Sequence, residues 1–113
     1  MKNIVILISG GGSNMAAIVR TAQRERWADT LGARVVAVIS NRPGAAGLGL
    51  ARELGVGAAE TLDHKAFDSR EAFDAALAER IDQHAPALVV LAGFMRILTP
   101  GFVAHYAGRL VNI

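Results

Sequence analysis

Apolar runs rich in β-branched residues alternate along this chain with segments in which apolar residues recur at helical spacing. Apolar runs that do not alternate with polar residues are typical of strands buried on both faces of a sheet. Strands are therefore predicted at 3–9, 34–40, 87–92 and 109–113, with a weaker strand at 56–59.

The segments between the runs predict helices, because their apolar residues fall three and four positions apart and form one face. The first segment, 13–28, carries on that face Met15, Ile18, Val19 and Ala22. Further helices are predicted at 44–54 and 69–84. At the start of the last helix, Asp68 is expected to cap the first turn, with Glu71 supporting it from the N3 position.

Strands and helices that alternate in this way predict βαβ units with right-handed crossovers and parallel strands. The predicted fold class is therefore α/β: a Rossmann-like open parallel sheet with helices on both faces, in one domain over residues 1–113. Nothing follows the final predicted strand, 109–113, to cover the edge that it leaves. We therefore expect the fold to be truncated at its C-terminal side.

The composition is that of a globular domain, because 52% of the 113 residues are hydrophobic and 19% are charged. The formal net charge of +2 comes from basic residues spread along the chain, so we expect no nucleic-acid surface, which needs clustered charge. The first apolar run is too short to span a membrane, and no membrane partner is expected. Cysteine is absent, which excludes disulfides and thiolate metal sites, and we expect a cytoplasmic protein without a metal.

A glycine-rich run, Ser9-Gly10-Gly11-Gly12-Ser13-Asn14, follows the first predicted strand and opens the first predicted helix. Glycines let the backbone approach a ligand closely, and the amide groups at a helix start attract an anion. The side chains of Ser13 and Asn14 add further donors. The run therefore predicts a phosphate-binding loop, and the alternative is a plain strand-to-helix turn.

Two better-known phosphate loops do not fit this run. A P-loop needs a lysine after its last glycine, and no lysine lies nearby. The dinucleotide pattern G-x-G-x-x-G fits Gly10 and Gly12 but has Met15 at its third glycine. The second predicted strand also ends, at 40–42, without the acid that an NAD ribose requires. The loop therefore suits a monophosphate.

A second candidate segment, 92–100, follows the third strong strand. Ligands of open parallel sheets bind beyond the carboxyl ends of the strands, where the strand order reverses, so this segment and the glycine-rich run are expected to meet there. Four of its residues are unusually apolar for a loop and suit the floor of a site for a flat aromatic ligand: Phe94, Met95, Ile97 and Leu98. The alternative, which spacing alone favours, is that they are core residues of a short helix at 95–106.

Four stretches of the chain, 6–14, 66–71, 89–98 and 106–113, resemble in order and spacing the glycinamide ribonucleotide transformylase family. The resemblance covers essentially the whole chain and implies the N-terminal portion of the formyltransferase fold. It further implies transfer of a formyl group from 10-formyltetrahydrofolate to the amine of 5-phosphoribosylglycinamide, in de novo purine (IMP) biosynthesis. Small-molecule substrates, folate among them, are then the expected partners of a monomer or homodimer.

The resemblance also implies roles for particular residues. It implies that the ribose phosphate of the substrate is held by Gly12, Ser13 and Asn14, in agreement with the loop inferred above. It implies that folate is bound, largely through backbone groups around the pterin, by Met95, Arg96, Ile97 and Leu98.

Two further residues take their roles from the resemblance alone. Arg70 matches an arginine that contacts the benzoyl-glutamate end of folate, and the alternative is an exposed arginine in the first turn of a helix. Asn112 matches the family's catalytic asparagine, which also contacts folate and stabilises the oxyanion as the amine attacks the formyl carbon. The alternative is an ordinary asparagine at a strand end.

The family's catalytic histidine is not among these residues. The family pattern continues from Asn-Ile into His-Pro, so this histidine and a later aspartate that tunes it would lie beyond Ile113. The 113 residues on their own are therefore expected to be inactive. The histidines that are present, His64, His84 and His105, are expected to be surface residues, and no acidic partner for them is apparent from the sequence.

Two other functions are alternatives to this one. A formyltetrahydrofolate hydrolase would share the fold and the donor, but a phosphate-type loop favours a phosphorylated substrate over water. A non-catalytic Rossmann module for nucleotides is disfavoured by the missing third glycine and the missing ribose acid.

Overall fold

Five parallel strands form one sheet in the computed structural model, which describes residues 1–113. The strands are β1 (Lys2–Ile8), β2 (Ala33–Ser40), β3 (Ala58–Thr61), β4 (Pro86–Leu91) and β5 (Leu110–Asn112). Each predicted strand is present with its bounds shifted by no more than two residues. All the pairings are parallel, as the alternation of strands and helices predicts.

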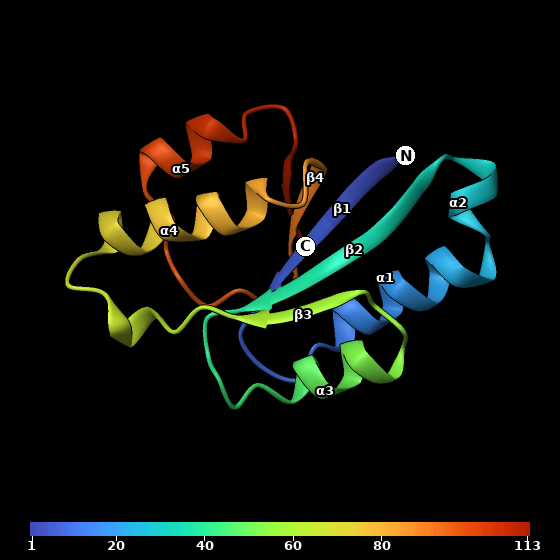
Figure 1. Cartoon of the computed structure of the whole chain (residues 1–113), viewed down its shortest axis with the longest axis horizontal. Helices are drawn as coiled ribbons and strands as arrows, with labels where there is room; N and C mark the ends of the chain where they lie inside the picture. The colour runs from blue at the N-terminus through green and yellow to red at the C-terminus, as the bar shows by residue number, and fades with distance from the viewer.

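Helices cover both faces of this sheet. They are α1 (Ser13–Arg24), α2 (Trp27–Thr30), α3 (Ala46–Glu53), α4 (Arg70–Asp82) and α5 (Pro100–His105), with a short 3-10 helix, η1 (His64–Ala66). In Figure 1, α1, α2 and α3 lie on one side of the sheet, and α4 and α5 lie on the other. The predicted fold class, an open parallel sheet with helices on both faces, is confirmed.

Alternate residues of β1 face the two helical layers. Ile6 is fully buried in a cluster with Met15 of α1. Val5, its neighbour in the strand, is fully buried in a second cluster with Phe73 of α4 and with Tyr106, which follows α5 directly. A strand with a helical layer on each face needs apolar side chains at every position, which explains the unbroken apolar run.

The order of the strands places β1 in the middle of the sheet, as β3-β2-β1-β4-β5. The chain moves outward from β1 through β2 to β3, and then crosses to β4 on the other side of β1. Leu7 near the end of β1 pairs with Leu91 at the end of β4. The carboxyl ends of β1 and β4 therefore lie side by side where the strand order reverses, which is the usual ligand site of such sheets.

Two predicted helices have different bounds in the structure. The helix expected at 13–28 is interrupted at Arg26, whose φ of 53° is left-handed and cannot continue a right-handed helix. The helix expected at 95–106 begins only at Pro100, because Thr99 caps it by accepting a hydrogen bond from the Phe102 amide at 3.3 Å. The residues before Thr99 form a loop.

The predicted cap of α4 is also wrong by one position. Ser69 caps the helix, because its hydroxyl accepts a hydrogen bond from the Ala72 amide at 3.0 Å. Asp68 lies outside the helix, and Glu71 is its second residue instead of its third. Serine and aspartate are equally good caps, so the sequence alone does not decide between neighbours.

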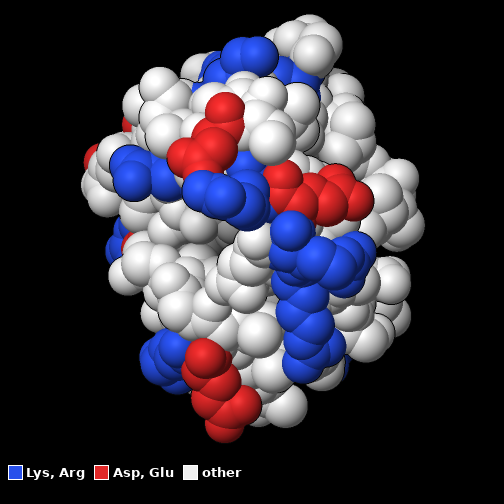
Figure 2. All heavy atoms as spheres, turned by 90° about the vertical axis from the view of Figure 1, so that its right-hand side faces the viewer, with Lys and Arg blue, Asp and Glu red and all other residues white.

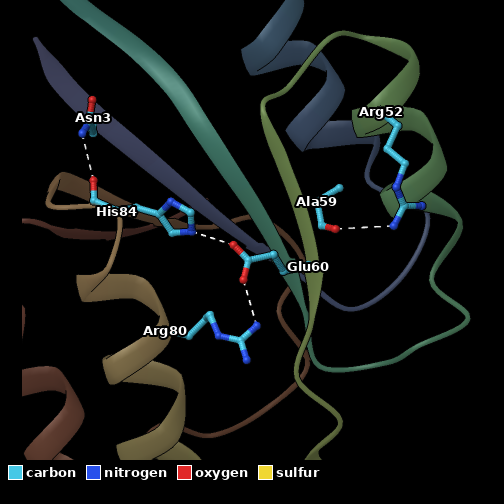
Figure 3. Close-up of polar contacts among 6 residues, drawn as sticks. All are labelled: Asn3, Arg52, Ala59, Glu60, Arg80 and His84. Carbon is cyan, nitrogen blue, oxygen red and sulfur yellow. Dashed lines mark hydrogen bonds and ion pairs between the residues drawn. The ribbon is translucent and has the colours of Figure 1, made fainter.

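Glu60 joins the edge strand β3 to the end of α4 (Figure 3). Its carboxylate accepts hydrogen bonds from Arg80 at 2.8 Å and from His84 at 2.6 Å. Burial raises the pKa of Glu60, but the hydrogen bonds and charges of Arg80 and His84 outweigh burial and hold this pKa below its ordinary value of 4.5. The carbonyl of His84 in turn accepts from the Asn3 side chain at 2.8 Å, which extends the connection to β1.

Two of the three histidines have acidic partners that the sequence did not make apparent. His84 pairs with Glu60, and Nε2 of His105 lies 2.7 Å from Oδ2 of Asp82. Asp82 also accepts a hydrogen bond from the Tyr106 hydroxyl at 2.8 Å. Burial first, and then this contact with Asp82, raise the pKa of Tyr106. The partners lie more than twenty residues apart in sequence, beyond the reach of any local pattern.

Figure 2 shows the face of the molecule on the α2 side, where basic and acidic side chains lie beside one another. Within α2 and its cap, Arg26 and Asp29 form an ion pair of 2.6 Å. None of the helices combines the length and apolar character that crossing a membrane requires.

Candidate functional site

The glycine-rich run forms the connection between β1 and α1, as predicted, and we call residues 9–12 the glycine loop. Gly12 is the N-cap of α1 and has a φ of 75°, a left-handed conformation that favours glycine. No side chain caps this helix, and its first helical hydrogen bond joins the Ala16 amide to the Gly12 carbonyl at 2.8 Å. The amides of residues 13–15 therefore precede the helical ladder, beside the exposed side chains of Ser13 and Asn14.

The glycine loop also packs closely against the start of α3. A Cβ on Gly12 would lie 3.0 Å from the Cα of Gly47, and the Gly47 amide donates to the Gly10 carbonyl at 3.0 Å. In contrast, a Cβ on Gly10 or Gly11 would meet nothing within 4 Å. Packing thus explains the glycine at position 12, while the other two leave the backbone open to a ligand.

The glycine loop touches the segment that follows β4, as the sequence predicts. We call residues 92–99 the β4–α5 loop. Its Met95 amide donates a hydrogen bond of 2.8 Å to the hydroxyl of Ser9. The two candidate segments are therefore brought together at the carboxyl ends of β1 and β4.

The apolar side chains of the β4–α5 loop divide into two groups. Met95 and Ile97 are 72% and 74% exposed, so the alternative that they are core residues is wrong. Phe94 and Leu98 are half-buried and pack against the core cluster that contains Phe73. The loop thus holds two apolar side chains inward and presents two outward, next to the glycine loop.

Two residues of this loop, Arg96 and Thr99, are held by side chains of α4. The guanidinium carbon of Arg96 lies 4.8 Å from the centre of the Phe73 ring, a cation–π contact with a half-buried arginine. The Thr99 amide donates a 2.7 Å hydrogen bond to Asp74, whose side chain is almost fully buried. The side chain of Arg96 therefore points toward α4. Only the backbone of Arg96 lies between the exposed side chains of Met95 and Ile97.

No hydrogen bond joins the side chains of Asn112 and Arg70 to the two loops. Asn112 is the last residue of β5, pairs with Leu91 in the β4 ladder and is exposed. The Ile113 amide donates to the Leu91 carbonyl at 3.1 Å, which holds this strand end beside β4. Arg70 is the first residue of α4 and is exposed, and no hydrogen bond or ion pair joins it to the other candidate residues.

An open groove of about 610 Å³ lies on the other side of the glycine loop. The connection after β2 and the residues around η1 form its remaining walls, and the basic side chains among them are Arg42, His64 and Lys65. None of these three residues is among the site residues predicted from the sequence. A polar segment, 40–42, directly after a buried strand was the only sign of them.

Among the buried polar residues here, Ser9 belongs to the predicted glycine-rich run, whereas Asn41 was missed. Ser9 and Asn41 follow β1 and β2 directly and are 1% and 2% exposed. Polar residues at the carboxyl ends of adjacent parallel strands are the signal that could have found Asn41. No three His, Cys, Asp or Glu side chains come together as a possible metal site.

A family profile described as formyl transferase matches residues 2–113. The chain belongs to the formyl transferase family. Its five-stranded parallel sheet with helices on both faces is the Rossmann-like fold of the solved formyltransferases that it matches.

Several members of this family are close to the chain. It is 55% identical over 111 residues to the phosphoribosylglycinamide formyltransferase of Escherichia coli, an alignment that covers 98% of this chain and 50% of that protein. It is 45% identical to the trifunctional purine biosynthetic protein adenosine-3 of Drosophila melanogaster, over 99% of this chain and 8% of that protein.

The solved structures agree with the sequence comparison. The crystal structure of glycinamide ribonucleotide transformylase 1 from Symbiobacterium toebii matches with a TM-score of 0.88 and 42% identity, over 99% of this chain and 50% of that one. The formyl transferase chain described here thus spans about half the length of the bacterial relatives that it matches.

Proposed function

We propose that the polypeptide carrying this chain transfers a formyl group from 10-formyltetrahydrofolate to the amine of 5-phosphoribosylglycinamide, in cytoplasmic purine biosynthesis. The observation that carries the proposal is the contact between the glycine loop and the β4–α5 loop through Ser9 and Met95. This contact joins a loop suited to phosphate and a loop suited to a flat ring, at one edge of the sheet. The bacterial relative that is 55% identical is named for this formyl transfer.

The phosphate of the acceptor would bind at the start of α1. Gly12 lets the backbone turn there, and the amides of residues 13–15 are free of the helical ladder. A helix start carries a partial positive charge, so it favours an anion. The hydroxyl of Ser13 and the carboxamide of Asn14 are exposed at the same place and would complete the phosphate site.

The folate would bind against the β4–α5 loop. Met95 and Ile97 offer exposed apolar surface, while the backbone of residues 95–98, Arg96 and Leu98 included, offers polar groups to the pterin edge. A flat ligand that is apolar on its faces and polar at its edges suits such a surface. Arg70, exposed at the start of α4, would meet the carboxylates of the benzoyl-glutamate tail.

Asn112 would act on the reacting atoms. As the amine nitrogen bonds to the formyl carbon, the carbonyl oxygen gains negative charge, which the carboxamide N–H of Asn112 would stabilise. The bond from that carbon to the folate nitrogen then breaks, and the proton lost by the amine passes to this nitrogen. One donor of this kind is worth roughly a hundredfold to a thousandfold in kcat in a well-studied enzyme.

The test is to incubate the intact polypeptide with 10-formyltetrahydrofolate, with and without 5-phosphoribosylglycinamide, and to follow both products by mass spectrometry. Formylated product that appears only when the amine is present supports the proposal. Release of formate at the same rate without the amine would identify a hydrolase. Absence of turnover together with binding of NADP would identify a nucleotide-binding module.

A further inference from the structure

A chain of buried polar groups crosses the carboxyl ends of the strands behind the candidate site. Ser9 follows β1, Asn41 follows β2, and His64 begins η1 after β3. Ser9 and Asn41 are almost fully buried and His64 is half-buried. Buried polar groups are costly unless they are paired, so such a chain has a defined arrangement.

The direction of each hydrogen bond in this chain is fixed by the Ser9 hydroxyl. Its oxygen accepts the bond from the Met95 amide at 2.8 Å, because an amide N–H can only donate. Its single hydrogen is therefore available for Oδ1 of Asn41, at 2.5 Å. The hydroxyl is thus used once as an acceptor and once as a donor, and it cannot rotate without losing one of the two.

His64 holds the other end of Asn41. Its Nδ1 lies 3.3 Å from Nδ2 of Asn41 and 3.0 Å from the Asn41 carbonyl. The ring accepts from the carboxamide in one tautomer and donates to the carbonyl in the other. The contact with Nδ2 keeps Oδ1 of Asn41 directed at Ser9, whereas the contact with the carbonyl holds the ring against the backbone of Asn41.

We propose that Ser9 is a positioning residue, which fixes the β4–α5 loop against the glycine loop and so sets the distance between the formyl donor and the phosphorylated acceptor. Ser9 is itself the first residue of the glycine loop, and its hydroxyl accepts the only hydrogen bond between that loop and Met95. The far end of the β4–α5 loop is held separately, by Asp74 on Thr99. This inference rests on the proposed function for its catalytic part.

Ser40 provides a matched control for Ser9. It ends β2, is also fully buried, and its hydroxyl also makes two hydrogen bonds, to the carbonyl and from the amide of Arg42. Neither bond reaches the β4–α5 loop. Ser9→Ala and Ser40→Ala therefore remove the same group from equivalent depths, and only the first releases Met95.

The experiment compares both variants with the unaltered intact polypeptide, by hydrogen exchange of the Met95 amide and by steady-state kinetics. In Ser9→Ala we expect Met95 to exchange at least about tenfold faster, because its amide loses its acceptor. We expect KM for the formyl donor to rise about tenfold and KM for the acceptor to change less than about threefold, because the glycine loop keeps its contacts with α3. In Ser40→Ala all three quantities should stay within about twofold of the unaltered protein.

A second pair of variants tests the role of Asn41 if Ser9→Ala fails to fold. Asn41→Asp keeps an acceptor for the Ser9 hydroxyl and should preserve the slow exchange of Met95, whereas Asn41→Leu removes the acceptor and should speed it. Equal exchange and equal KM changes in the Ser9 and Ser40 variants would overturn the inference. Absence of formyl transfer by the unaltered protein would refute the proposed function instead, while faster exchange confined to the Ser9 variant would still support the restraint.

Discussion

Gly47 and the glycine loop meet where α3 and α1 begin, and this contact makes a sharp test at the scale of one residue. A Cβ on Gly47 would lie 2.5 Å from Cδ1 of Ile8 and 3.0 Å from the carbonyl oxygen of Gly10. We expect Gly47→Ala to lower the free energy of unfolding by about 1–3 kcal/mol, because the backbone must shift. We also expect it to raise KM for the phosphorylated substrate more than KM for folate.

The control lies two residues further along the same helix. A Cβ on Gly49 would meet nothing within 4 Å, so Gly49→Ala should be neutral or stabilise the protein by up to about 1 kcal/mol. Thermal unfolding and steady-state kinetics of both variants provide the measurement. Equal behaviour of the two variants would show that the contact at Gly47 does not constrain the glycine loop.

Arg70 carries the second prediction at this scale. If it meets the folate tail, Arg70→Ala should weaken folate binding by about 0.5–2 kcal/mol at low salt, and by less at high salt, because exposed ion pairs are screened. Arg20 of α1, also exposed, serves as the control. Titration calorimetry of the intact polypeptide at two salt concentrations measures the effect. Unchanged folate affinity in Arg70→Ala at low salt would show that Arg70 is an ordinary surface residue.

At the scale of an element, the start of α4 offers a comparison between two neighbouring caps. The Ser69 hydroxyl accepts a hydrogen bond from the Ala72 amide, and Asp68 has no such contact. Ser69→Ala should therefore cost about 1 kcal/mol of stability. Asp68→Ala should cost less than about 0.5 kcal/mol, as for a surface position. Urea unfolding of the two variants decides, and a larger loss for Asp68→Ala would contradict the assignment of the cap.

The elements differ in how well the sequence predicts them. Strands such as β1 and β2 were predictable because burial on both faces demands unbroken apolar runs. The end of α1 was not predictable. The residue with the left-handed conformation there is Arg26, and no glycine or proline marks the position in the sequence. Spacing alone favours a helix over the β4–α5 loop, and it fails there because the shape of the loop depends on Ser9 and Asp74, which lie 86 and 25 residues from their partners.

At the scale of the whole molecule, the contacts of Glu60 with Arg80 and His84 make the free energy of unfolding depend on pH. The pKa of Glu60 is lower in the folded protein than its ordinary value of 4.5. Its stabilising contribution is therefore complete above pH 4.5 and is lost as the pH falls through the lower, folded value. We expect the Tm difference between the unaltered protein and Glu60→Gln to be constant from pH 7 to about pH 5 and to shrink below it. A difference that grows as the pH falls would contradict this sign.

The 113 residues alone should fail to catalyse formyl transfer. A positioned acid–base group contributes roughly 10²–10⁴-fold to a rate, and no histidine here is placed to supply it. His84 and His105 pair with acids away from the loops, and His64 contacts Asn41. The measurement is turnover by residues 1–113, shown to be folded by circular dichroism, with the Escherichia coli relative as the positive control. Turnover within tenfold of that enzyme would overturn the roles inferred from the family.

The central place of β1 has a consequence for how the chain acquires its structure. Asn3 pairs on one side with Arg34 and on the other with Pro86. During synthesis, β1 thus obtains its second neighbour, β4, only after the long segment between them has been made. Until then one edge of a strand that is apolar from Ile4 to Ile8 stays open to pairing with other molecules. Slow, non-local folding follows from this arrangement, and nascent chains that stop before β4 should be the ones most prone to aggregate and to recruit chaperones.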